Sequence, residues 1–406
     1  TIIMLVYSVF NNIFLGYGLT LSLILFSLVG LKRDKSLKDL IKLYIFESKR
    51  SLPIIHILLL ISVLISTWLC CGTIPSIVYY SLKYINPNLF ILFCFLISAI
   101  TSFLIGTSFG TVSSIGIPLV IIAQASNLNL NIVGGAIMSG AYFGDRCSPL
   151  SSSLLLLCNL TKVELFNYVK KVFIFGIIPT IISILFYLFF SLKNPLTFVD
   201  NSLSLALFDN FHINVFLLIP AIIIVILSLK KVPITKSITF SIVAAILISL
   251  IVQKTNFYGL FKYMIFGYET SSSLSSIIKG GGIISMLKTC YIIIISCCLT
   301  GFFSGLNIFY NFKKSLEKIT LNRSNLFIIT LVLGLIVAAI GCSQTIAFIL
   351  TLEILRDTYK NYENEDIAME FSNSAIVTSA LIPWCIAALV PTSVLSISNY
   401  QFIPYA

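Results

Sequence analysis

Long apolar stretches constrain this chain more than any other feature of its sequence. Residues 172–192, 237–252 and 326–350 contain no charged side chain at all. About 20 apolar residues in helical form cross a hydrocarbon layer of about 30 Å. Because backbone groups inside lipid must bond to one another, stretches of this length predict helices and not barrel strands. The sequence therefore predicts an all-α, polytopic membrane protein.

Composition agrees with this class and excludes others. Hydrophobic residues make up 58% of the 406 residues and charged residues only 10%, whereas soluble domains carry about 25% charged residues. The net charge of +11 lies in the loops, so we interpret it as a topology signal and expect no nucleic-acid partner. The ten cysteines lie mostly within apolar runs without a metal-binding spacing, as small hydrophobic residues do. We expect no cofactor.

Basic loops predict the topology, because Lys and Arg mark the cytoplasmic side. They gather at residues 32–50, 162–171, 230–236 and 313–323. Polar stretches alternate with these loops, and this pattern predicts crossings at Val172–Leu192, Ile213–Leu229, Ser237–Val252, Ile283–Phe309 and Leu326–Leu350, with Glu353–Glu370 as an outer loop. We expect about 10 transmembrane segments in a multi-pass protein of the plasma membrane. The number of crossings between Arg50 and Lys162 stays open.

The chain divides into four predicted regions. Residues 1–50 form an N-terminal transmembrane helix and a basic amphipathic segment on the cytoplasmic surface; residues 51–192 form a first transport repeat. Residues 193–282 supply connecting transmembrane helices, and residues 283–406 form a second transport repeat. The sequence starts without Met and stops at Ala406 without a polar tail. We therefore expect that sequence is missing at both ends.

Small and polar residues interrupt the apolar runs at four places, which form two matched pairs. The first pair runs from Gly106 to Pro149 and the second, of nearly equal length, from Gly341 to Pro383. The residues expected to break the helices are Gly106, Gly110, Gly144, Pro149, Gly341 and Pro383. Breaks at corresponding positions of two halves indicate a transporter with inverted-topology repeats and broken or re-entrant helices. The alternative is that small residues merely let helices pack closely.

Asp145 is the carboxylate that these interruptions single out. Acids within membrane segments mark ion or proton pathways, and a carboxylate away from water can be neutralised by either a sodium ion or a proton. The candidate neutral oxygen donors around it are Thr107, Ser108, Thr111, Ser148, Ser151, Gln344, Asn373 and Thr378. Two other interpretations remain: Asp145 could pair with Arg146, or it could lie in a wet loop at the membrane edge.

With these residues in view, the chain resembles the NhaC-type sodium/proton antiporter family of the ion transporter superfamily. Gly106-Thr-Ser-Phe-Gly-Thr111 is similar to the family's GTSWGT element, and the segment from Gly140 to Pro149 is similar to its GAYFGD-K/R-x-SP signature. Thr378-Ser-Ala-Leu-Ile-Pro-Trp384 resembles a C-terminal element. The family's LEDSGT element reads Phe371-Ser-Asn-Ser-Ala-Ile376 here, so its carboxylates are absent and the identity of the exchanged solute stays open.

The resemblance implies sodium/proton antiport by alternating access, with Asp145 binding the transported sodium. It also implies an alternative, because the family includes exchangers that couple sodium and protons to organic acids such as malate and lactate. A small carboxylate substrate and a homodimer are both left open. An intramembrane enzyme is not expected, since the serines from Ser148 to Ser153 have no neighbouring His and no catalytic motif appears. A passive channel is the remaining alternative.

Overall fold

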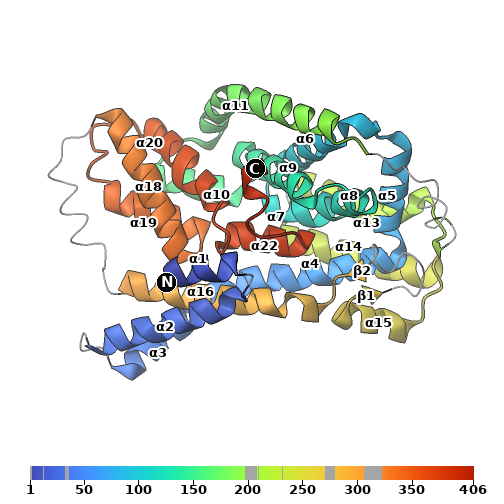
Figure 1. Cartoon of the computed structure of the whole chain (residues 1–406), viewed down its shortest axis with the longest axis horizontal. Helices are drawn as coiled ribbons and strands as arrows, with labels where there is room; N and C mark the ends of the chain where they lie inside the picture. The colour runs from blue at the N-terminus through green and yellow to red at the C-terminus, as the bar shows by residue number, and fades with distance from the viewer. Residues whose placement is uncertain are drawn as a thin grey trace. The chain divides into compact units, whose positions relative to one another are not determined.

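The computed structural model describes residues 2–11, 13–32, 36–196, 208, 210–230, 232–269, 279–305 and 322–406, and these are almost entirely helical (Figure 1). Seven of the described helices are long and apolar enough to cross a membrane: Leu15–Lys32, Leu52–Cys71, Pro87–Ile105, Ser108–Ala125, Leu165–Lys193, Ile234–Ile251 and Arg323–Gly341. Shorter apolar helices are Ser152–Thr161, Val215–Leu229, Ile283–Leu299, Gln344–Leu355 and Ile386–Leu395. The prediction of an all-α polytopic membrane protein is confirmed.

The chain folds into two compact units. Unit 2 contains residues 57–155, 165–287 and 391–406. Its helices are α4 (Leu52–Cys71, which begins in unit 1), α5 (Thr73–Tyr84), η2 (Pro87–Leu89), α6 (Phe90–Ile105), α7 (Ser108–Thr111), η3 (Val112–Gly116), α8 (Ile117–Ala125), α9 (Leu130–Cys147), α11 (Leu165–Lys193), η4 (Val215–Leu218), α13 (Ile219–Leu229), α14 (Ile234–Ile251), α15 (Phe257–Phe266), η6 (Ile283–Met286) and η8 (Ile403–Tyr405). A two-stranded ladder joins β1 (Tyr268–Glu269) to β2 (Lys279–Gly280).

Unit 1 contains residues 1–56, 156–164 and 288–390. Its helices are α1 (Ile2–Phe10), α2 (Leu15–Lys32), α3 (Leu37–Ser48), η1 (Lys49–Ser51), α18 (Arg323–Gly341), α19 (Gln344–Leu355), α20 (Asn364–Phe371), η7 (Ser372–Ile376) and α21 (Val377–Ser379); α10 (Ser152–Thr161), α16 (Leu287–Gly305) and α22 (Ile386–Leu395) have residues in both units. The predicted amphipathic segment is the helix α3, whose N-cap Ser36 accepts a hydrogen bond from the Asp39 amide.

In unit 2, three consecutive helical segments pack together: α6, then the antiparallel segment from α7 to α8, and then α9, which is parallel to α6. α6 and α9 run side by side in the same direction, because Gly140 packs on Phe95 and Gly144 packs one turn further along, on Ala99. Between them the chain turns back through α7, η3 and α8, so that Gly116 lies against Ile137 of α9. The order is therefore helix, break, antiparallel helix, turn, and a third helix parallel to the first.

Unit 1 repeats this arrangement with α18, α19 and α20 (Figure 1). α18 ends at Gly341 and α19 returns along it, because Tyr359, which follows α19, bonds to Thr330 in the first half of α18. α20 then starts beside the beginning of α18, where Asp366 pairs with Arg323. This corrects the prediction of a single crossing at Leu326–Leu350 with Glu353–Glu370 on the far side. The apolar run is two antiparallel helices, and the acidic turn lies at the end where α18 began.

Candidate ion-binding site

The first break consists of two residues with very different backbone conformations. Gly106 closes α6 in the left-handed region at φ +75°, and Thr107 is extended at φ −154°, ψ 128° before α7 begins. Only glycine fits at position 106, because a Cβ there would lie 2.5 Å from the Cβ of Leu150 and would also occupy the left-handed region. The predicted break at Gly106 is confirmed, and it places the first amide of α7 at the end of α9.

Asp145 lies at that point, half-buried in the last turn of α9. The backbone amide of Ser108 donates a hydrogen bond of 3.2 Å to Asp145 Oδ2. The hydroxyl groups of Ser108 and Ser151 interact with the same carboxylate. Because a helix N-terminus carries partial positive charge, the start of α7 stabilises a negative group here. Within the described residues these are the recorded partners of Asp145, so the alternative pairing with Arg146 is not the one found.

The other predicted oxygen donors near the first break serve mainly the local backbone. The Thr111 hydroxyl donates to the Thr107 carbonyl oxygen (3.0 Å), and the Ser148 hydroxyl accepts from the Leu150 amide (3.2 Å). Pro149 lies in the same turn between α9 and α10. Ser151 has a double role, since its hydroxyl accepts from the Leu154 amide and contacts Ser153 while it faces Asp145. Of these residues, only Ser108 and Ser151 converge on the carboxylate.

Gly144 has a packing role, which agrees with the alternative interpretation of the small residues. A Cβ on Gly144 would lie 2.3 Å from the Ala99 carbonyl oxygen, and one on Gly140 would lie 2.3 Å from the Phe95 carbonyl oxygen. The Ser102 hydroxyl adds a hydrogen bond to the Ala141 carbonyl oxygen (2.5 Å). α9 runs through Gly144 without a break. Gly110 likewise lies inside a helical segment, α7, where a Cβ would lie 2.7 Å from Thr107 Cγ2.

The second break has the same backbone pattern, one residue later than predicted. Gly341 is the last residue of α18; Cys342 is left-handed at φ 53°, and Ser343 is extended at φ −141°, ψ 126°. Two hydrogen bonds hold this turn: the Ile386 amide donates to the Cys342 carbonyl oxygen (2.8 Å), and Trp384 Nε1 donates to the Ala339 carbonyl oxygen (2.7 Å). The match between the two breaks is therefore conformational and does not require glycine at both.

Gln344 opens α19 and is the predicted donor that lies closest to this break. Its Nε2 donates to the Ile376 carbonyl oxygen (3.1 Å), at the end of the π-helical turn η7. Single π-turns are frequent at functional sites, and Asn373 lies in this one. Thr378 donates to the Ser374 carbonyl oxygen (2.8 Å). Pro383 lies in the irregular segment between α21 and α22, so the predicted interruption there is confirmed.

The two breaks differ in what faces the first amide of the second helix. In unit 2, the Ser108 amide faces the carboxylate of Asp145. In unit 1, the Gln344 amide, with those of Ile386 and Ala387, faces the fully buried thiol of Cys385. The predicted meeting of both breaks around one cavity stays a prediction, because each break belongs to a different unit.

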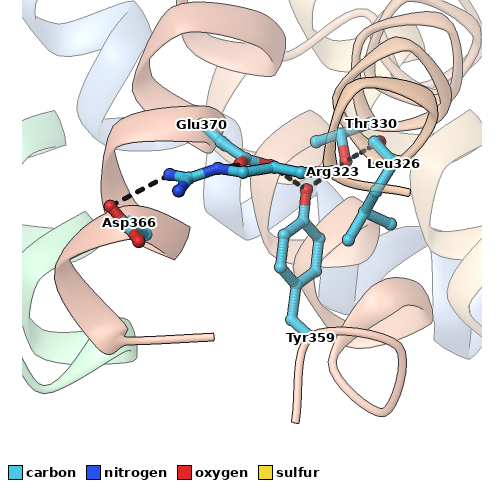
Figure 2. A network of polar contacts seen from close by, with 6 residues as sticks. All are labelled: Arg323, Leu326, Thr330, Tyr359, Asp366 and Glu370. Atoms are coloured by element: carbon cyan, nitrogen blue, oxygen red, sulfur yellow. Dashed lines mark hydrogen bonds and ion pairs between the residues drawn. The ribbon is translucent and has the colours of Figure 1, made fainter. Parts of the chain in front are cut away.

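A charged network in unit 1 was missed by the sequence interpretation. Figure 2 shows the carboxylate of Glu370 between Arg323 and Tyr359. Arg323 Nε donates to Glu370 Oε1 (3.2 Å), and the Tyr359 hydroxyl contacts Glu370 Oε2 at 2.5 Å. The Tyr359 hydroxyl also lies 2.7 Å from Thr330 Oγ1, and a second guanidinium nitrogen of Arg323 pairs with Asp366 (3.0 Å). Glu370 is 7% exposed and directly precedes the last residue of α20, next to the π-turn. The sequence signal that could have found Glu370 is its position two residues before Ser372, where the polar cluster of the second repeat begins.

A separate cavity of about 550 Å³ lies in unit 2 at the far end of the α7–α9 hairpin. It is lined by apolar side chains of α4 and α8, by Gln124 and Leu130, and by the β1–β2 ladder with Glu269 and Lys279. Leu130 and Asp145 are 15 residues apart on α9, which corresponds to about 22 Å of helix. This cavity is therefore distinct from the surroundings of Asp145.

Comparison with known proteins agrees with this architecture. The chain is 26% identical to the malate-2H(+)/Na(+)-lactate antiporter of Bacillus subtilis, over 99% of this chain and 88% of that protein. It is 24% identical to the Na(+)/H(+) antiporter NhaC of Alkalihalophilus pseudofirmus, over 87% and 78%. It is 25% identical to the arginine/ornithine antiporter ArcD of Halobacterium salinarum, over 86% and 75%. The model of the Na+/H+ antiporter family matches residues 1–192 and 140–406. The chain therefore belongs to the Na+/H+ antiporter family.

Proposed function

We propose that this protein exchanges sodium ions for protons across the cell membrane, and that Asp145 is the group that binds either ion. The observation that carries the proposal is the position of this carboxylate at the break, against the Ser108 amide and the hydroxyls of Ser108 and Ser151. Oxygen donors suit a small hard cation. A sodium ion would take the carboxylate together with these hydroxyl oxygens, whereas a proton on the carboxyl group would neutralise it without them.

Alternating access follows from how the two broken hairpins enter the membrane. The end of α11 lies beside the beginning of α6, because the Leu196 amide donates to the Pro87 carbonyl oxygen (3.1 Å). α11 begins at Leu165, inside the basic segment 162–171, and α18 begins at Arg323, the last residue of the basic segment 313–323. Because basic loops lie on the cytoplasmic side, we infer that α6 enters from outside and α18 from the cytoplasm. Repeats of opposite direction support a two-state carrier rather than a passive channel.

The direct test is proton flux in proteoliposomes under an imposed sodium gradient. Wild-type protein should change the internal pH, and Asp145→Asn should abolish the change, because an amide of nearly the same shape binds neither a proton nor sodium as a carboxylate does. Glu363→Gln is the matched control, since this exposed carboxylate makes no side-chain capping bond at the start of α20. Sodium-driven proton flux in Asp145→Asn equal to that of the control would remove Asp145 from the mechanism.

A second candidate is exchange of a small organic acid coupled to sodium and protons. One relative of nearly full coverage is a malate-2H(+)/Na(+)-lactate antiporter. In addition, the Gln344 amide at the start of α19 faces the Cys385 thiol, and no carboxylate of the described residues is recorded against it; amides at a helix start favour an anion. Counterflow of labelled malate or lactate in the same proteoliposomes tests this candidate. Proton flux that is complete with sodium alone, and unchanged by either acid, would exclude it.

A further inference from the structure

The network around Glu370 contains one more short contact than its hydroxyl protons can fill. Three oxygen–oxygen contacts follow one another: Glu370 Oε2 to Tyr359 (2.5 Å), Tyr359 to Thr330 Oγ1 (2.7 Å), and Thr330 Oγ1 to the Leu326 carbonyl oxygen (2.9 Å). The two hydroxyl groups supply two protons. If Glu370 is ionised, Tyr359 donates to it, and the Thr330 hydroxyl donates either to Tyr359 or to the Leu326 carbonyl oxygen, so that one of these two contacts holds no proton.

A proton on Glu370 Oε2 completes this chain. Glu370 then donates to Tyr359, Tyr359 donates to Thr330, and Thr330 donates to the Leu326 carbonyl oxygen, as Figure 2 allows the reader to trace. Heavy-atom positions are the same in both cases, because they do not specify which oxygen carries a hydrogen. Tyr359 relays and does not ionise: burial, and next the bond to Glu370, raise the pKa of its hydroxyl.

The charges of the network lead to the same protonation state. The charged and titratable groups recorded against Glu370 are Arg323 from α18, Tyr359 from the α19–α20 turn and, through Arg323, Asp366 of α20 itself. Arg323 pairs with both carboxylates, at 3.0 Å from Asp366 and at 3.2 Å from Glu370. With Glu370 ionised, Arg323, Asp366 and Glu370 together carry a net charge of −1, and the Glu370 side chain is only 9% exposed; with Glu370 protonated, these three residues are neutral together. Buried groups favour the neutral arrangement.

We propose that Glu370 is a second proton-binding residue of this protein, and that the proton it binds is counted in the exchange. On release, the proton passes from Glu370 Oε2 to water, Tyr359 turns its hydroxyl toward the resulting carboxylate, and Arg323 Nε stabilises the new charge. Arg323 is 58% exposed, so water reaches this side of the network. α20 continues directly into the π-turn whose Ile376 carbonyl oxygen binds Gln344, which connects the protonation of Glu370 to the second break.

Infrared difference spectroscopy of the purified protein between acid and alkaline pH tests the proton site without transport. Wild-type protein should show the loss of a protonated-carboxyl band on alkalinisation, and this band should be absent from Glu370→Gln and present in Glu363→Gln. Tyr359→Phe should shift the band to higher frequency, because the carboxyl loses its hydrogen-bond acceptor. If Glu370→Gln does not fold, the shift in Tyr359→Phe decides. Unaltered bands in the folded variants would overturn the proposal.

The part concerning exchange rests on the proposed function and has its own measurement. Balancing a sodium gradient against a pH gradient gives the number of protons exchanged per sodium ion. Glu370→Gln should lower this number by one while transport continues, because the amide keeps the contacts to Tyr359 and Arg323 but releases no proton. An unchanged number would remove Glu370 from the exchange. If wild-type protein shows no sodium-coupled proton flux, the proposed function fails, whereas the infrared result for Glu370 still stands or falls by itself.

Discussion

The close contact between α6 and α9 leads to a stability prediction for Gly144→Ala. The added Cβ would lie 2.3 Å from the Ala99 carbonyl oxygen and 2.7 Å from the Phe103 amide nitrogen. These are backbone atoms of α6, so no side chain can turn away. The two helices must separate by about 1 Å to restore ordinary contact. Overpacking of this kind costs about 1–3 kcal/mol, and we expect a value near the upper end, about 3 kcal/mol.

The assay is the free energy of unfolding of the purified protein, titrated from a mild into a denaturing detergent. Gly259→Ala is the matched control, because Gly259 lies in the helix α15 and none of the described residues comes within 4 Å of the position that a Cβ would take there. The exchange at Gly259 should be neutral or stabilising by up to about 1 kcal/mol, since Ala has the higher helix propensity. Gly144→Ala should also weaken sodium binding, because Asp145 follows directly and its 3.2 Å bond to Ser108 depends on where α9 ends. A Gly144→Ala protein as stable as the Gly259→Ala protein would refute the packing of α6 on α9.

Two further predictions follow from unit 1 and unit 2 in turn. Glu363→Cys should react with a membrane-impermeant maleimide from the cytoplasmic side, because the turn before α20 lies beside the beginning of α18. The ten native cysteines are buried and should not react. Labelling from outside only would contradict the α18–α19 hairpin. Tyr187→Phe should lower the free energy of unfolding by about 1 kcal/mol, because the Tyr187 hydroxyl lies 2.7 Å from the Tyr405 carbonyl oxygen and 2.8 Å from Ser139 Oγ. The C-terminal segment should also be cleaved faster by a protease. An unaltered unfolding curve would show that this contact is not stabilising.

The fold class and the two breaks were predictable because they depend on local properties of the chain. Long uncharged runs specify helices in lipid, and Gly106 marks a residue that must have positive φ. The second break was predicted one residue early, since Gly341 still belongs to α18 and the left-handed residue is Cys342. A cysteine does not by its residue type indicate a left-handed conformation. The turn at Cys342 is stabilised by hydrogen bonds from Ile386 and Trp384, which lie about forty residues further along the chain.

The return of α19 along α18 was not predictable from hydropathy. A run of apolar residues from 326 to 350 has the same composition whether it continues in one direction or folds back at residues 342–343. The direction is specified by distant side chains, such as the contact between Tyr359 and Thr330. Glu370 was missed for a related reason: it closes the charged stretch Glu353–Glu370, which was interpreted as a loop, although the packed structure buries it. The convergence of Ser108 and Ser151 on Asp145 also depends on tertiary structure, and the role of these residues in ion binding stays a prediction.

Each break is only two residues long, one left-handed and one extended, between two helical segments. Few residues between rigid elements make a hinge, because a rotation about a few backbone bonds reorients everything beyond it. At Gly106 and Thr107, such a rotation would move the segment from α7 to α8 as one rigid body and would separate the Ser108 amide from Asp145. Ion release and helix movement would then be the same event, without any unfolding of the helices themselves.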